Sequence, residues 1–90
     1  MKFGYFSIIQ WHESMTQADS IEDVMQQVEL ADELGLDEAW FGEHHFSRHG
    51  LISGIFSVLG HAAARTKRIR LGTAVVVLPF HHPILVAQEA

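Results

Sequence analysis

The chain lacks cysteine altogether, has only two prolines and contains no long apolar run. Without cysteine it has no disulfide framework, no thiol nucleophile and no thiolate zinc site, which fits the reducing cytoplasm. Residues 3–9 are apolar but follow a single lysine, are too short for a signal-peptide core and lack a small-residue cleavage site. No window is long enough to span a bilayer. We therefore expect a cytoplasmic protein without a membrane partner.

Basic residues are also scarce, with 6 Lys and Arg against 11 Asp and Glu among 90 residues. Most of the bases cluster between Arg65 and Arg70, whereas the acids lie mainly before residue 48. Because no aromatic residues interleave this cluster and the overall balance is acidic, we expect no nucleic-acid partner. With 48% hydrophobic residues, the composition indicates one small globular domain rather than a disordered chain.

Periodicity in the first half predicts a strand and a helix. Residues 2–9 are almost continuously apolar, as expected of a strand covered on both faces. Residues 10–19 are polar and predict a loop long enough to be functional. A helix is expected from a Ser20 cap, with Asp23 three residues on, to a stop at Gly35.

The second half repeats this pattern. Short strands are expected at residues 36–42 and 69–78, separated by a helix at 53–64. Pro79 should end the third strand, and Pro83 fits the first turn of a third helix. The order β-α-β-α-β-α indicates parallel strands joined by helical crossovers.

Two architectures share this order, and the first strand distinguishes between them. A doubly wound sheet normally has a phosphate-binding glycine motif there, but residues 8–12 read Ile-Ile-Gln-Trp-His. We therefore expect an α/β fold corresponding to the first three strands of a TIM-type (β/α)8 barrel. Such a barrel needs about 250 residues. Residues 1–90 are thus expected to form a partial barrel domain, truncated within its third helix.

Histidines gather after the three predicted strands, where parallel β/α proteins carry their functional groups. Six of the seven histidines lie there; only His61, treated as structural, lies elsewhere. Because imidazole exchanges protons near neutral pH, this distribution favours a proton-handling or ligand-binding site. The six are His12, His44, His45, His49, His81 and His82.

Each candidate also has a purely structural interpretation. His81 and His82 flank a helix start, where either could simply cap the backbone. Adjacent residues of a strand face opposite sides, so one of His44 and His45 should face the site while the other braces it. Glu43 could orient an imidazole or merely end the strand in a salt bridge. The spacing of these residues is poor for a metal ion, and we expect none.

Three segments together resemble the N-terminal part of the bacterial luciferase-like monooxygenases. They are KFGYF at residues 2–6, AWFGEHHF at 39–46 and LGTAVVVLPFHHP at 71–83. The resemblance covers essentially all 90 residues. It implies a β/α barrel that uses reduced FMN with O2 or, in one branch, the deazaflavin F420.

The resemblance also implies roles for individual residues. His44 would be the catalytic acid or base beside the flavin, and His45 would assist or position it. Cofactor-binding positions would be Phe6 and Phe46 as apolar walls, Glu43, and the pair Ala74 and Val75 under the flavin ring. In the family this pair is often joined by a non-prolyl cis peptide, whereas the residues alone indicate ordinary strand packing.

We therefore expect a flavin-dependent monooxygenase acting with O2 on a small organic substrate such as an aldehyde, with a separate flavin reductase as a possible partner. The usual barrel phosphate site follows strands seven and eight, so the 90 residues alone should bind flavin weakly or not at all. The alternatives are a non-catalytic barrel fragment that associates with itself, as a homo-oligomer, and an F420-dependent hydride-transfer oxidoreductase.

Overall fold

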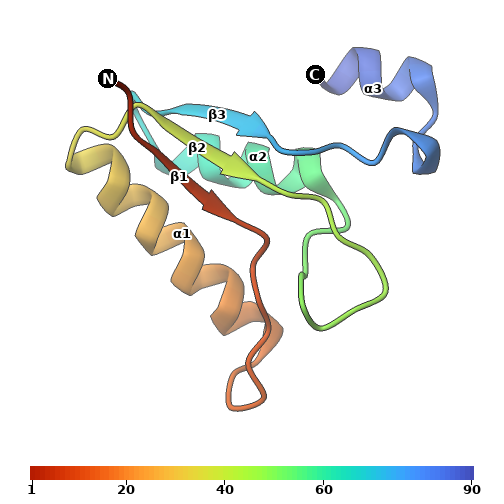
Figure 1. Cartoon of the computed structure of the whole chain (residues 1–90), viewed down its shortest axis with the longest axis horizontal. Coiled ribbons are helices and arrows are strands. Elements are labelled where there is room, and N and C mark those ends of the chain that lie inside the picture. The colour runs from red at the N-terminus through yellow and green to blue at the C-terminus, as the bar shows by residue number, and fades with distance from the viewer.

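Three parallel strands form the centre of the computed structural model, which describes residues 1–90 (Figure 1). They pair in the order β1-β2-β3, with Phe6 opposite Trp40 and Trp40 opposite Gly72. Helices connect them, as the sequence predicts. The elements are β1 (Gly4–Ser7), α1 (Gln17–Glu33), β2 (Glu38–Phe41), α2 (Ile55–Arg65), β3 (Arg70–Thr73) and α3 (Pro83–Glu89). None of the helices is both long and apolar enough to cross a membrane.

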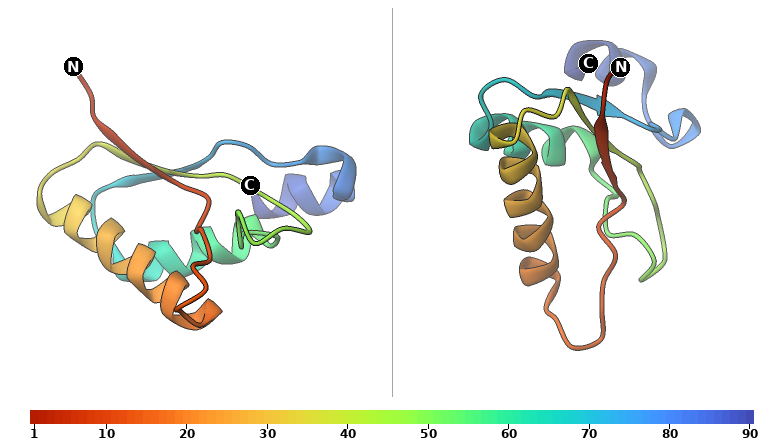
Figure 2. Two further views of the ribbon diagram at one scale, coloured as in Figure 1. Left: turned by 60° about the horizontal axis from the view of Figure 1, so that its bottom comes forward. Right: turned by 60° about the vertical axis from the view of Figure 1, so that its left-hand side comes forward.

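The sheet and the helices α1 and α2 form two layers, with both helices on the same side of the sheet (Figure 2). Ala39 and Phe41 point from β2 toward these helices and are completely buried. Val28 of α1 and Ile55 of α2 meet them in one apolar cluster. Burial of this cluster is the main force that holds the layers together.

The first strand differs from its prediction, because it is covered on one face only. Tyr5 faces α1, where its hydroxyl donates to Gln27 Oε1 at 2.9 Å. Phe6, which points to the opposite face of the strand, remains 59% exposed. The reason is that both helices pack on the same side, so the other side of the sheet stays open within these 90 residues.

Helix α1 starts one turn before the predicted Ser20 cap. Thr16 is the cap: its hydroxyl accepts from Asp19 N at 3.1 Å, and the Asp19 carboxylate accepts from Thr16 N at 3.2 Å. Both Thr16 and Ser20 have an acid three residues later, so the sequence motif fits either position. Ser20 instead lies buried inside the helix, with its hydroxyl donating to Thr16 O.

The third strand is shorter than its valine-rich sequence predicts. It ends at Thr73, and Leu78–Phe80 form a short 3-10 helix. Val77 N donates to the Glu43 side chain at 2.8 Å rather than to a neighbouring strand. The Glu43 side chain, which follows β2, thus accepts the hydrogen bond that a neighbouring strand would accept if β3 were longer.

Ion pairs join the acidic first half of the chain to the basic second half. Arg65, at the end of α2, contacts Glu22 at 2.6 Å and Glu29 at 2.7 Å on α1. Asp32, in the last turn of α1, accepts from three backbone amides at residues 67–69 at 2.7–3.1 Å. The cluster of bases is therefore largely engaged within the chain.

The ion pairs of Arg65 with Glu22 and Glu29 predict that the stability of the fold depends on pH in the acid range. Hydrogen bonds from Arg65 lower the pKa of Glu22 from 4.5 to about 2 and also lower the pKa of Glu29. A carboxyl group whose pKa is depressed by folding stabilises the fold above its unfolded pKa and loses that contribution as pH falls through the folded value. The urea concentration at the unfolding midpoint should therefore decrease as the pH is lowered from about 4.5 to about 2. Arg65→Gln should flatten this dependence; an unchanged profile in that variant would contradict the assignment.

Candidate active site

The residues that follow the three strands form one surface, here called the strand-end face. Its centre is the loop after β2, residues 42–54, which is held to neighbouring segments by backbone bonds. His44 N donates to Ile52 O at 2.7 Å, and Leu51 N donates to Ile8 O at 3.1 Å. These hydrogen bonds fix the position of the backbone that carries His44 and His45.

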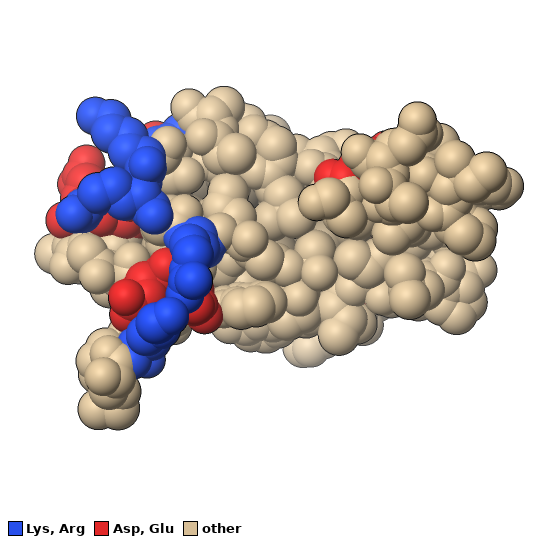
Figure 3. All heavy atoms as spheres, turned by 90° about the horizontal axis from the view of Figure 1, so that it is seen from above, with Lys and Arg blue, Asp and Glu red and all other residues tan.

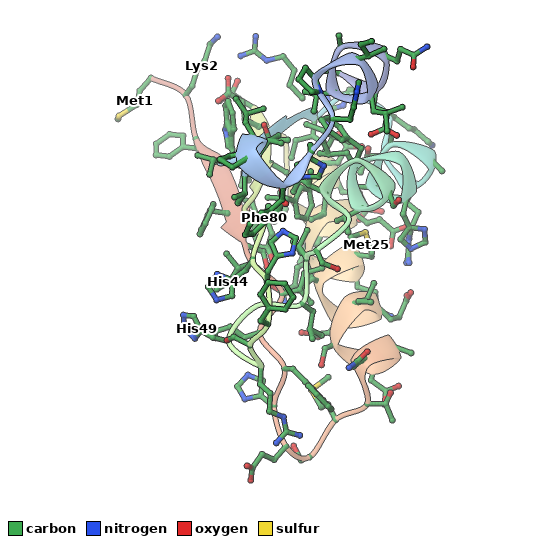
Figure 4. The ribbon with its side chains drawn as sticks, turned by 90° about the vertical axis from the view of Figure 1, so that its right-hand side faces the viewer. Met1, Lys2, Met25, His44, His49 and Phe80 are labelled. Atoms are coloured by element: carbon green, nitrogen blue, oxygen red, sulfur yellow. The ribbon has the colours of Figure 1, made fainter.

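The two adjacent histidines face different surroundings, although β2 ends at Phe41 and neither histidine lies in the strand. Figure 4 shows His44 and His49 side by side, pointing away from the helices, whereas Met25 lies on the helix side. Their rings meet edge to face, with centroids 5.8 Å apart. His45 instead contacts the carboxylate of Glu43. His44 is therefore the histidine that faces the open side of the sheet.

Glu43 is the buried polar centre of the strand-end face. Its side chain is fully buried, and its carboxylate accepts from Val77 N at 2.8 Å. His81 Nε2 lies 2.8 Å from Oε1 and 2.9 Å from Oε2, and His45 Nε2 contacts Oε1. Of the two interpretations of Glu43, the one in which it orients imidazoles describes this geometry.

The surroundings of Glu43 keep it ionised. Burial opposes ionisation and is the largest single influence, but the bonds from His45, Val77 N–H and His81 together outweigh it. The net result is a pKa below the ordinary value for a glutamate. At neutral pH the group is a carboxylate, which accepts hydrogen bonds and donates none.

Aromatic rings surround this polar centre. The Phe80 ring meets His45 edge-on at 4.8 Å, and the Phe46 ring lies 5.6 Å from His45. Phe46 is 97% exposed and has a φ of +57°, an unusual conformation for a bulky residue. Residues with such an uncommon backbone conformation are frequent at functional sites.

The open side of the strand ends carries small and apolar groups. Ala74 and Val75 are exposed and are joined by a cis peptide bond. Gly42 lies between them and Phe6: a Cβ there would come within 3.0 Å of Ala74 O and 3.4 Å of Phe6 Cζ. Exposed apolar groups of this kind can pack against the ring of a flavin.

The same surface offers little to a phosphate group. Four of the six bases lie from the last residue of α2 to the first residue of β3, and Lys2 comes just before β1, so these five are at the opposite end of the strands. In Figure 3 the Lys and Arg side chains accordingly gather toward one end of the molecule. The remaining base, Arg48, stacks 4.1 Å above the Trp11 ring and lies 3.7 Å from Glu13. The residues therefore fit the ring of FMN and not its phosphate.

The structure brings together only some of the histidines singled out in the sequence. His82 caps α3, with Ile84 N donating to its Nδ1 at 3.3 Å, which is the structural interpretation. His61 is exposed on α2, and His12 is exposed in the loop after β1. His81 joins His45 on Glu43, although neither the sequence motif nor the spacing indicated this pairing. The signal was the shared location after neighbouring strands.

Comparison with known proteins supports the resemblance seen in the sequence. The family model for luciferase-like monooxygenases matches residues 1–90. The 4-hydroxyprotoasukamycin monooxygenase of Streptomyces nodosus subsp. asukaensis is 48% identical over 66 residues, 73% of this chain and 18% of its own length. The limonene 1,2-monooxygenase of Rhodococcus erythropolis is 42% identical over 88 residues, covering 97% of this chain and 22% of its own length.

Solved structures agree with the fold. Apo-MsnO8 superimposes with a TM-score of 0.92 at 28% identity, over 98% of this chain and 26% of its own. The oxygenating constituent of 3,6-diketocamphane monooxygenase from Pseudomonas putida, in complex with FMN, gives 0.90 at 21% identity, over 99% and 24%, which shows a shared fold. This chain spans about a fifth to a quarter of the proteins it matches. By its family match along its whole length, the chain belongs to the luciferase-like monooxygenases.

Proposed function

We propose that this chain forms the first three β/α units of a flavin-dependent monooxygenase barrel, in which the strand-end face lies against reduced FMN. The observation that carries the proposal is the position of His44, which points to the open side of the sheet. Phe6, Ala74 and Val75, at the ends of the other two strands, are exposed apolar residues. The FMN complex of a protein with the same fold supports the choice of cofactor.

In this proposal His44 is the proton donor or acceptor of the reaction. An imidazole changes charge near neutral pH, so it can give or take a proton without a large energetic cost. His44 is partly exposed toward the open side, and its backbone is fixed by the bond from His44 N to Ile52 O. Glu43 holds the neighbouring His45 away from this side, leaving His44 to face the cofactor.

The other residues are proposed to bind the flavin ring and exclude water. Phe6, Ala74 and Val75 would hold the ring through apolar contacts. Phe46, together with Phe80, would cover the site, because oxygen chemistry requires protection from solvent. Reduced FMN supplies the electrons with which O2 is activated; the protein supplies orientation, protons and a dry environment.

The substrate is proposed to be a small organic molecule, such as an aldehyde, and a separate reductase is proposed to provide reduced FMN. The FMN-bound protein of the same fold is the oxygenating constituent of its monooxygenase, which is consistent with such a division of labour. A flavin whose phosphate is held elsewhere is expected from the absence of a free base on the strand-end face. The rest of the barrel would provide that site.

Flavin titration of the purified chain tests the location of the ring site. Binding is followed by fluorescence quenching. FMN and riboflavin should bind with similar affinities, both weaker than micromolar, because the FMN phosphate finds no partner here. Phe6→Ala should weaken both, since it removes an exposed apolar contact. Phe3→Ala is the matched control: it is equally exposed but precedes β1, at the opposite end of the strand.

The alternatives give different titrations. No quenching, together with a concentration-dependent oligomer in sedimentation experiments, would favour a non-catalytic fragment that associates with itself. Preferential binding of F420 over FMN would favour hydride transfer. Equal losses of flavin affinity in Phe6→Ala and Phe3→Ala would show that the flavin ring does not bind at the strand-end face.

A further inference from the structure

The carboxylate of Glu43 joins two loops that are far apart in the sequence. It accepts from Val77 N at 2.8 Å and lies within 2.9 Å of His81 Nε2, both in the segment after β3. It also contacts His45 Nε2, in the loop after β2. Both side chains that contact this buried carboxylate are therefore imidazoles, and each contacts it through its Nε2 atom.

The ionised carboxylate of Glu43 determines the tautomers of His45 and His81. An ionised carboxylate has acceptor sites only, so each Nε2 that contacts it must carry the hydrogen. In a neutral imidazole the other nitrogen is then the acceptor. Both His45 and His81 are accordingly held as Nε2–H tautomers, with Nδ1 left to accept a proton.

No other charged group shares this cluster. The influences on Glu43 come from His45, His81 and the amide of Val77. The remaining neighbours are rings: Phe80 packs on His45 at 4.8 Å, and Phe56 of α2 lies 6.5 Å from His81. The two imidazoles are 17% and 22% exposed, so they connect the buried carboxylate with the surface.

We propose that Glu43 is a positioning residue that fixes the Nε2–H tautomers of His45 and His81, and that these two imidazoles support the proton transfer proposed for His44. The role in catalysis rests on the proposed function, but the tautomers do not. By holding His81 and Val77, Glu43 also places Phe80 against His45.

The test is ¹⁵N-detected imidazole NMR of the 90-residue chain, recorded without flavin at a pH where the imidazoles are neutral. In the wild type, His45 and His81 should both be Nε2–H, with Nε2 protons protected from solvent exchange. In Glu43→Gln, the carboxamide offers one acceptor oxygen and one donor nitrogen. One of the two histidines should therefore switch to the Nδ1–H tautomer, so that its Nε2 accepts from the amide.

Glu38→Gln is the matched control, because Glu38 is the first residue of β2, the strand that precedes Glu43, but bonds to Arg70 and Trp40. It should leave both tautomers unchanged, and exposed His61 provides an internal reference in every spectrum. The proposal is overturned if either wild-type imidazole is Nδ1–H, if the wild-type Nε2 protons exchange as fast as that of His61, or if Glu43→Gln folds and alters neither ring. Because no flavin is present, these outcomes are independent of whether the chain binds FMN.

Discussion

Phe41→Ala is expected to lower the free energy of unfolding by about 3–5 kcal/mol, the cost of removing a fully buried phenylalanine. Phe41 is completely buried and is the largest such side chain of the core. The substitution removes its contacts and leaves a cavity that the short strand β2 cannot close. Domains are generally stabilised by only roughly 5–15 kcal/mol, so this loss is a large fraction of the total. Urea unfolding followed by circular dichroism measures it.

Phe3→Ala makes the same chemical change at a side chain that is 61% exposed. It should alter stability by about 0.5 kcal/mol or less, as surface substitutions usually do. Comparable losses in the two variants would show that the core is not centred between β2 and the helices. Because both variants lose the same atoms, the comparison isolates the effect of burial.

His44→Ala is expected to reduce turnover by about 10²–10⁴-fold, the usual contribution of a positioned acid or base. The measurement requires a complete barrel, so this chain would replace the matching segment of the limonene 1,2-monooxygenase, to which it is 42% identical over 88 residues. Limonene oxidation by the chimera is then followed under the conditions in which the parent enzyme is active. The loss should appear in kcat, because the imidazole is proposed to act on protons rather than to bind substrate.

His61→Ala in the same chimera provides the control, since His61 is exposed on α2 and far from the strand ends in the chain's topology. Its turnover should stay within about twofold of the parent chimera, as expected for a surface position. If His44→Ala retained that level of activity, the proposed proton transfer would belong to another residue.

The repeat of strands and helices could be predicted from the sequence because it is carried by local patterns. Alternation of apolar runs and helical periodicity indicated the parallel order β1-β2-β3, and Pro83 marked the first turn of α3. Exact boundaries were less accessible. Thr16 and Ser20 satisfy the same capping motif, and only the packing of the helix, which buries Ser20, selects between them.

The candidate site was predictable in its location more than in its connections. The position of His44 and His45 after β2 followed from the order of the elements, but which ring faces the open side did not, because β2 ends at Phe41, before both residues. The pairing of His81 with Glu43 joins residues 38 positions apart. The valines after β3 likewise have a strong strand preference, yet Val77 bonds to the Glu43 side chain. Such long-range contacts leave no local pattern.

Asp32 has a consequence for the order in which the molecule is made. An acid in the last turn of a helix faces the negative pole of the helix dipole, and α1 has no base there to compensate. The three amides that satisfy this carboxylate belong to residues 67–69, about 35 residues later. During synthesis on the ribosome, the end of α1 is therefore expected to reach its full stability only after the amides before β3 have emerged.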